Sequence, residues 1–161
     1  MWTAAESVVN SWVTAHPDRV RDVRLLAPTE QVAAAIEMHA LERIVTNLIN
    51  NAFTHGRPPI SVRVRGEAGY AVLEVADSGD GMPPDLLVQA TRRFSRAAEA
   101  RSRPGAGLGL SIVEQLVTGA GGELRLCYGG HHVSSGTPTE VRCRHDDAMT
   151  ISVILPAATE A

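Results

Sequence analysis

The sequence of 161 residues contains no lysine, so all 15 of its basic residues are arginine. Any contact with an anion must therefore come from arginine, histidine or backbone N–H groups. The 18 acidic residues outnumber the basic ones and give a formal net charge of −3 at pH 7. This balance argues against a protein that binds nucleic acid through bulk basicity, and no nucleic-acid partner is expected.

Cysteine is also scarce, because Cys127 and Cys143 are the only two in the chain. They lie far apart and belong to no Cys-x-x-Cys or Cys/His ligand pattern, so the sequence suggests neither a zinc site nor a disulfide framework. A reduced, cytoplasmic protein is expected. No apolar run is long enough to span a bilayer, and the N-terminus lacks a signal-peptide pattern, so no direct membrane contact is expected of this chain.

With 44% hydrophobic and 20% charged residues, the chain suits one globular core, and a single domain over residues 1–161 is expected. Helical spacing of apolar residues predicts helices over 3–15, over 41–56, and from Leu108 to the glycines at 119–122. Alternation predicts strands over 20–26, 60–65, 70–76, 123–128 and 150–155, of which the second and third form a hairpin. Residues 31–37 are alanine-rich and ambiguous, and residues 129–148 are a loop or a loosely paired strand.

The stretch 41–56 organises the rest of the chain. Its apolar residues fall at i, i+3, i+4, i+7, i+8 and i+11, which makes one stripe suited to packing on a sheet. These residues are Leu41, Ile44, Val45, Leu48, Ile49 and Ala52. The same periodicity places Asn47, Asn51 and His55 on a line at one edge of the stripe, where each side chain would be half buried. That is an unusual position for two amides and an imidazole.

Two glycine-rich turns suggest a purine nucleotide as the ligand. Asp77 opens the first turn, with Gly79 and Gly81 behind it. Gly105, Gly107 and Gly109 form the second turn, which leads into a helix. Glycines let backbone N–H groups approach phosphates closely, and the N-terminus of the following helix adds a favourable dipole. One such turn is a weak signal, but the two turns and the amide-bearing helix together are a stronger one.

In this combination the chain resembles the ATP-binding domain of the GHKL superfamily, which includes gyrase B, Hsp90, MutL and histidine kinases, and specifically the catalytic domain of sensor histidine kinases. Residues 47–52 look like the N box, 77–82 the G1 box, 93–96 the F box and 105–113 the G2 box. The resemblance covers about residues 5–156. It implies the Bergerat fold, a two-layer α/β sandwich whose mixed β-sheet is covered on one face by about three helices, with a mobile ATP lid.

The resemblance also implies a role for individual residues. Asn51 would ligate a Mg²⁺ ion that bridges the ATP phosphates, Asn47 would support the phosphates or the metal shell, and Asp77 would accept a hydrogen bond from the exocyclic amine of adenine. The other nucleotide contacts implied within the G1 and G2 boxes are Gly79, Gly81, Met82, Gly105, Gly107, Leu108, Gly109 and Leu110.

The segment between the G1 and G2 boxes resembles the ATP lid. Arg96 matches the arginine of the family's F box and would contact phosphate oxygens, for which an arginine fork is well shaped. Phe94 either anchors the lid to the body or belongs to the ordinary core. His55 fits a family position near the nucleotide, and a satisfied histidine at a helix end is the alternative.

Asn47 separates branches of the superfamily. Hydrolytic members and anti-sigma-factor serine kinases usually carry glutamate here, where it acts as a general base. An amide cannot do that, so Asn47 favours a histidine kinase, which needs positioning and charge stabilisation rather than a base. An anti-sigma-factor-type serine kinase is the enzymatic alternative. A degenerate nucleotide-binding scaffold is the non-enzymatic alternative, because Thr54 and Thr91 replace family residues and Ala148-Met149 stands where a Gly-Thr pair usually precedes the last strand. The segment 129–147 also looks like an insertion.

The chain has no phosphoacceptor motif, since neither His16 nor His39 begins a dimerisation helix with the expected pattern. The acceptor histidine is therefore expected on a dimerisation domain, either elsewhere in a longer protein or in a separate partner chain. A response-regulator receiver domain is the expected next acceptor. The chain would then be a cytoplasmic part of a membrane-bound sensor, or a partner to one.

Overall fold

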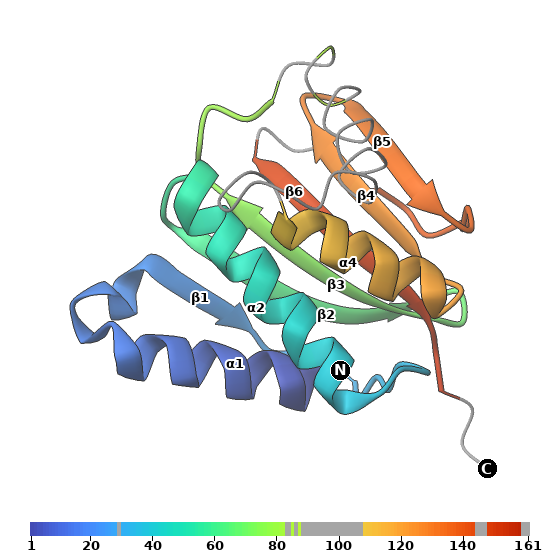
Figure 1. Cartoon of the computed structure of the whole chain (residues 1–161), viewed down its shortest axis with the longest axis horizontal. Helices are drawn as coiled ribbons and strands as arrows, with labels where there is room; N and C mark the ends of the chain where they lie inside the picture. Colours follow the sequence, from blue (N-terminus) through green and yellow to red (C-terminus); the bar gives the residue numbers. More distant parts are fainter. Residues whose placement is uncertain (29, 83–84, 86, 88–107, 144–147, 159–161) are drawn as a thin grey trace.

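The structure is a computed structural model that describes residues 1–28, 30–82, 85, 87, 108–143 and 148–158. These residues form two layers, with three long helices side by side over one face of a mixed β-sheet (Figure 1). The helices are α1 (Trp2–Ala15), α2 (Met38–His55) and α4 (Leu108–Gly119). The expected fold class is confirmed. None of the described helices is long and apolar enough to cross a membrane.

The sheet has six strands in the order β1-β2-β3-β6-β4-β5 among the described residues. Their bounds are Val23–Leu26 for β1, Ile60–Glu67 for β2, Tyr70–Asp77 for β3, Glu123–Tyr128 for β4, His131–Gly136 for β5 and Met149–Pro156 for β6. Strand β1 runs parallel to β2, and every other pairing is antiparallel. The β2–β3 hairpin turns at Ala68 (φ 52°) and Gly69 (φ 80°), and two successive positive φ angles match the twist of paired strands.

The core lies between α2 and the sheet. The same six apolar residues predicted from the helical spacing are the buried residues of α2. They pack against apolar side chains on the inner face of the sheet, such as Val62, Leu73 and Val153, each fully buried. Each such side chain contributes on the order of 2 kcal/mol through burial. This packing fixes how α2 is turned about its own axis.

One sequence prediction needs correction, and another had left two alternatives that the structure distinguishes. The strand expected over 20–26 is shortened to Val23–Leu26, because a 3₁₀ helix (η1, Pro17–Asp22) occupies the residues before it and Pro17 begins that helix with its fixed φ. For the segment 129–148, the sequence left a loop and a loosely paired strand as alternatives, and the paired strand is correct for part of it. Gly129 (φ 56°) and Gly130 (φ 80°) make a tight turn that returns His131–Gly136 to pair with β4. The pairing was hidden because β5 is mostly exposed and lacks apolar alternation.

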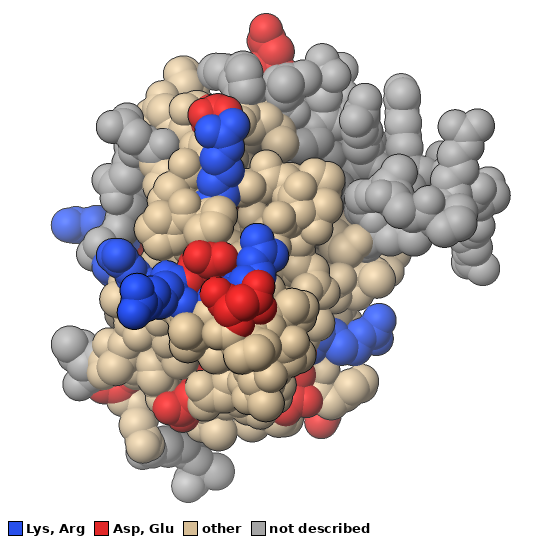
Figure 2. Space-filling model, turned by 90° about the vertical axis from the view of Figure 1, so that its left-hand side faces the viewer, with Lys and Arg blue, Asp and Glu red and all other residues tan. Residues whose placement is uncertain are grey.

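Charged side chains are mixed rather than segregated on the face where α1, η1 and β1 lie. Figure 2 shows basic and acidic atoms beside one another there. One such pair is Arg19 with Asp22 within η1, whose Nε and Oδ2 atoms lie 3.3 Å apart. Among the described residues, this face therefore carries no large patch of a single charge sign.

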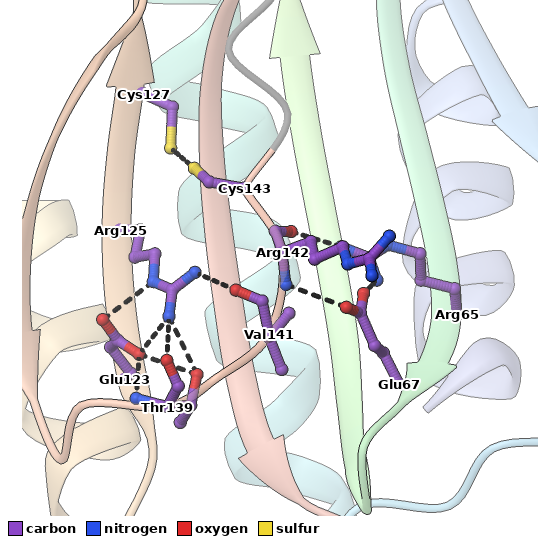
Figure 3. A network of polar contacts seen from close by, with 9 residues as sticks. All are labelled: Arg65, Glu67, Glu123, Arg125, Cys127, Thr139, Val141, Arg142 and Cys143. Atoms are coloured by element: carbon purple, nitrogen blue, oxygen red, sulfur yellow. Dashed lines mark hydrogen bonds and ion pairs between the residues drawn. The ribbon is translucent and has the colours of Figure 1, made fainter.

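Residues 137–143, which we call the strap, lie on the face of the sheet opposite the helices. Figure 3 shows them passing over β6 toward β3, with the helices behind the sheet. Val141 of the strap packs with Val72 and Ile154 in a small apolar cluster on this outer face. The strap therefore covers polar residues of the outer face that an open sheet would leave in solvent, such as Glu74 and Arg125, which are 6% and 5% exposed.

Candidate functional site

The candidate site begins with the row of polar side chains on α2. Asn47 and Asn51 are half buried, and His55 is exposed at the last position of the helix. Four residues of helix advance about 6 Å along the axis, so the row spans about 12 Å. Because the buried apolar face fixes the rotation of α2, these three residues are held along one edge of the helix layer.

Asn47 of α2 lies close to the first turn of α4. Its Nδ2 group donates a hydrogen bond to the carbonyl of Arg43, one turn earlier, at 2.7 Å. A Cβ added at Gly109 would lie only 2.9 Å from the Asn47 Oδ1 atom, so glycine allows the two helices to approach this closely. The N-terminus of α4, with its partial positive charge, therefore lies beside the amide row, which suits an anionic group.

Asn51 lies one turn further along. Within the described part of the chain, no residue forms a hydrogen bond with its side-chain amide. The amide is therefore available to a ligand. Thr54, nearby on the same helix, donates its hydroxyl to the carbonyl of Asn50 at 2.7 Å, and as a neutral side chain it adds no charge to the row. No group of three or more histidine, cysteine, aspartate or glutamate side chains that could hold a metal occurs among the described residues.

Asp77 lies at the other end of the row, where β3 ends. The residue as a whole is 8% exposed. The Oδ1 atom accepts hydrogen bonds from the backbone N–H groups of Gly79 at 2.8 Å and Arg57 at 3.3 Å. These bonds orient the carboxylate toward the loop that follows α2. The N–H of Ser78 also donates to the carbonyl of Arg57, at 2.8 Å, and holds that loop against the end of β3.

Two glycines make room for this carboxylate. A Cβ at Gly56, the residue that caps α2, would overlap the Asp77 carboxylate. A Cβ at Gly79 would lie 2.7 Å from Oδ1. The sequence identified Gly56 only as the end of a helix. Its closeness to Asp77 depends on how α2 packs on β3, which no local motif reports.

Tyr128 is a second residue that the sequence did not single out. Gly81 has φ 68°, and a Cβ there would overlap the ring of Tyr128 at the end of β4. The glycine-rich turn after Asp77 is thus braced by a strand that is distant in sequence. Met82, in the same turn, is half buried and packs against the core.

The remaining predicted site residues divide into two groups. Leu110 is 6% exposed, and its side chain belongs to the hydrophobic core and helps to anchor α4 there. Leu108 begins α4 as predicted. Phe94, Arg96, Gly105 and Gly107 lie outside the described residues, as does most of the expected ATP lid.

These features meet the requirements of a nucleotide site. A buried, oriented carboxylate lies at one end of α2, and an available amide and a helix N-terminus lie further along the same helix. From Asn51 to Gly56 the helix advances about 7.5 Å. One ligand with a base at one end and phosphates at the other could contact both ends.

Comparisons with known proteins agree with this geometry. A family model described as "Histidine kinase-, DNA gyrase B-, and HSP90-like ATPase" matches residues 37–158. The signal transduction histidine-protein kinase/phosphatase MprB of Mycolicibacterium vanbaalenii is 43% identical over 101 residues, which cover 61% of this chain and 20% of that protein. The sensor histidine kinase component HK1 of Mycobacterium tuberculosis is 41% identical over 88 residues, which cover 55% of this chain and 52% of that protein.

A solved structure of a mycobacterial sensor histidine kinase MprB superposes with a TM-score of 0.60 and 28% identity, and the match covers 94% of this chain and 95% of that one. This chain therefore spans a fifth to about half of the two relatives named above. Since the family model matches well over half of the chain, the resemblance inferred from the four motifs is confirmed. The chain belongs to the histidine kinase-, DNA gyrase B- and HSP90-like ATPase family, in the form found in two-component sensor histidine kinases.

Proposed function

We propose that this domain binds ATP with Mg²⁺ and delivers the γ-phosphoryl group to a histidine on a dimerisation domain outside this chain. The observation that carries the proposal is that both ends of the site lie along α2. Its C-terminal end supports the Asp77 carboxylate, and its middle presents Asn51 beside the N-terminus of α4.

Asp77 would recognise the adenine base. Backbone N–H groups already occupy Oδ1, while the carboxylate remains an acceptor with further lone pairs. An exocyclic amine can donate to such a group, whereas a carbonyl at the same ring position would meet it with repulsion. The carboxylate therefore favours adenine over guanine.

The phosphates would lie toward Asn51 and the first turn of α4. An amide oxygen suits Mg²⁺, a hard cation that keeps several waters and shares phosphate oxygens when bound. Asn47 would support this arrangement through its position at the α4 N-terminus. Gly105, Gly107, Phe94 and Arg96 would add the lid-side contacts that the family resemblance implies.

The site offers no general base at position 47. The Asn47 amide is neutral, and its Nδ2 group is tied to the carbonyl of Arg43. Phosphoryl transfer to an imidazole can proceed through positioning and charge stabilisation alone. This supports transfer to histidine and weighs against a serine kinase, whose hydroxyl nucleophile would benefit from a base.

The acceptor domain would lie either in a longer protein that contains this chain or in a separate polypeptide. Both arrangements have support among the relatives, because this chain spans 20% of MprB, and HK1 is named as a component. A receiver domain of a response regulator would then take the phosphoryl group from histidine. The domain would then lie in the cytoplasm, beside or within a membrane-bound sensor.

Calorimetric titration with a non-hydrolysable ATP analogue, with and without Mg²⁺, tests the binding step. We expect saturable binding that Mg²⁺ strengthens. Asp77→Asn should abolish binding, because the amide group presents a donor toward the amine, whereas Asn51→Ala should mainly remove the Mg²⁺ dependence. Normal binding by both variants would show that the site is elsewhere, and no binding by the unchanged protein at millimolar nucleotide would defeat the proposal.

Phosphoryl transfer is tested by mixing the chain with γ-labelled ATP and candidate histidine-bearing domains. We expect acid-labile label on the acceptor, as a phosphohistidine gives. Acid-stable label would instead identify a serine kinase. Nucleotide binding without transfer to any acceptor would favour a scaffold role.

A further inference from the structure

The strap at residues 137–143 is attached to the outer face of the sheet by two polar clusters. In the first, Arg125 on β4 lies against Glu123 through two hydrogen bonds, from Nε at 2.8 Å and from Nη2 at 2.7 Å. The same guanidinium donates to the carbonyls of Val141 at 2.6 Å and Thr139 at 2.8 Å. The side chains of Arg125 and Glu123 are only 6% and 3% exposed, so the strap covers this ion pair on β4.

The second cluster attaches the strap to the β2–β3 hairpin. The backbone N–H of Arg142 donates to Glu67 Oε1 at 2.9 Å, and the carbonyl of Arg142 accepts from Arg65 Nη2 at 3.2 Å. Arg65 also pairs with Glu74 at 3.0 Å and contacts Glu67. The residue that follows Arg142 is therefore held in place from both sides of β6 (Figure 3).

That residue is Cys143, and its thiol meets the thiol of Cys127 on β4. The two Sγ atoms lie 2.7 Å apart, and the side chains point toward one another (Figure 3). Both cysteines are free. Cys127 is 1% exposed, whereas Cys143 is half buried and reaches solvent. Cys143 is thus the more exposed residue of the pair, and Cys127 is the protected one.

The surroundings favour the thiolate at the accessible position. A hydrogen bond from Cys127 lowers the pKa of Cys143 to about 7, although burial by itself would raise it. The nearby guanidinium of Arg125 also lowers this pKa. Glu74 opposes this lowering through its negative charge. Donating that hydrogen bond raises the pKa of Cys127, as does its burial. Cys143 is therefore the better nucleophile of the two, and Cys127 is placed to act as the resolving thiol.

We propose that Cys127 and Cys143 form an oxidation site that a peroxide converts into an intramolecular disulfide, which locks the strap to β4. The inference rests on the placement of the pair and not on the proposed nucleotide chemistry. The sequence did not suggest it, since the spacing of the two cysteines matches no known pattern and only the path of the strap brings them together.

The chemistry balances with one peroxide molecule. The Cys143 thiolate attacks one oxygen of hydrogen peroxide, the O–O bond breaks, and the departing hydroxide takes up a proton as water, leaving a sulfenic acid on Cys143. Cys127 then loses its proton and attacks that sulfur. The S–S bond forms, the S–O bond breaks, and hydroxide leaves as the second water. Two thiols are oxidised by two electrons in total, and the peroxide is reduced.

The test exposes the full reduced chain to hydrogen peroxide, blocks remaining thiols with an alkylating agent, and measures intact mass and linked peptides. We expect the unchanged protein to lose two hydrogen atoms and to yield one peptide pair joined through Cys127 and Cys143. Closing this loop should raise the midpoint of thermal unfolding by about 5 °C or more. A reducing agent should reverse both changes.

Two variants separate the roles of the thiols. In Cys127→Ala the reaction should stop at a sulfenic acid on Cys143, which a dimedone probe traps. In Cys143→Ser the buried Cys127 should remain a thiol for as long as the unchanged protein needs to oxidise fully. The proposal is overturned if the unchanged protein forms links only between two molecules, if Cys143 ends as a sulfinic acid with no link, or if Cys127 oxidises equally fast in Cys143→Ser.

Discussion

At the scale of single residues, the carboxylate of Asp77 shows how closely the site is built. Its Oδ1 atom is bonded by two backbone N–H groups, and Gly56 and Gly79 leave no room for a side chain beside it. The glycines of the first turn are therefore required by contact with Asp77 as well as by any approach to a ligand. That explains why glycine, rather than another small residue, follows two positions after the aspartate.

Gly79→Ala should weaken binding of ATP analogues by about 10-fold or more, because the new methyl group at 2.7 Å from Oδ1 displaces the carboxylate from its bonds. Gly119→Ala is the matched control, since a Cβ there meets nothing within 4 Å. Calorimetric titration of both variants checks this. Equal binding by Gly79→Ala and Gly119→Ala would contradict the role assigned to the contact.

Alkylation of Cys143 should report its ionisation. Its pKa is lowered to about 7 by the hydrogen bond from Cys127 and by Arg125, with Glu74 acting against it. The thiolate fraction grows as pH rises through the pKa, so the rate of reaction with iodoacetamide should rise with a midpoint near pH 7. In Cys127→Ala the hydrogen bond is lost and the midpoint should move to higher pH. A midpoint unchanged by Cys127→Ala would argue against the thiol pair.

At the scale of elements, the strap adds a partial third layer to a two-layer fold. It depends on a buried ion pair, Glu123 with Arg125, which also supplies the hydrogen bonds that hold Thr139 and Val141. Removing one member of such a pair leaves the other charge buried without a partner, which costs more than the pair itself contributes. The strap is therefore sensitive to single substitutions in β4.

Glu123→Gln should lower the free energy of unfolding by about 3 kcal/mol at pH 7, measured by urea denaturation. Burial by itself would raise the pKa of Glu123, but hydrogen bonds from Arg125 and Thr139 lower it below its ordinary value of 4.5. The stabilisation from a lowered carboxyl pKa is complete above 4.5 and is lost as pH falls through the folded value. The difference between variant and unchanged protein should therefore shrink in acid. The exposed Glu140→Gln in the strap is the control and should differ little at either pH.

The elements with strong periodicity were predictable from the sequence, and the others were not. The helix at 41–56 and the hairpin at 60–76 carry their own periodicities, so both elements could be predicted, and for the helix the six buried residues as well. Strand β5 carries none, because its residues are mostly exposed and it is held by backbone bonds to β4. The strap could not be predicted from the sequence either, because its attachment depends on polar contacts between residues that are far apart in the chain.

At the scale of the whole molecule, the candidate site draws on segments that the fold brings together. Asn47, Asn51 and Asp77 could be proposed from sequence, because each lies in a short motif with a recognisable composition. Gly56 and Tyr128 could not, since their closeness to Asp77 and Gly81 is set by helix packing and strand order. The roles of all these residues toward a nucleotide stay predictions.

Nucleotide binding should stabilise the whole domain. At a free concentration of an ATP analogue 100 times its Kd, with Mg²⁺ present, mass action adds about 2.7 kcal/mol to the free energy of unfolding. For a chain of this size that corresponds to a rise of about 5 °C or more in Tm, which scanning fluorimetry can measure. Asp77→Asn should show no rise, and a GTP analogue should give little. Equal shifts with both nucleotides would exclude Asp77 as a reader of adenine.

The six buried residues of α2 have a further consequence for how this chain can change in length. Each residue of a helix turns it by about 100°, so one residue inserted between Leu41 and Asn47 would force either the apolar stripe or the amide row out of position. The Gly129–Gly130 turn is less constrained, because it is exposed and carries neither core nor site residues, and a Cβ at either glycine meets nothing within 4 Å. Length variation in this domain should therefore be tolerated at sheet turns and rejected within the helix that carries both core and site.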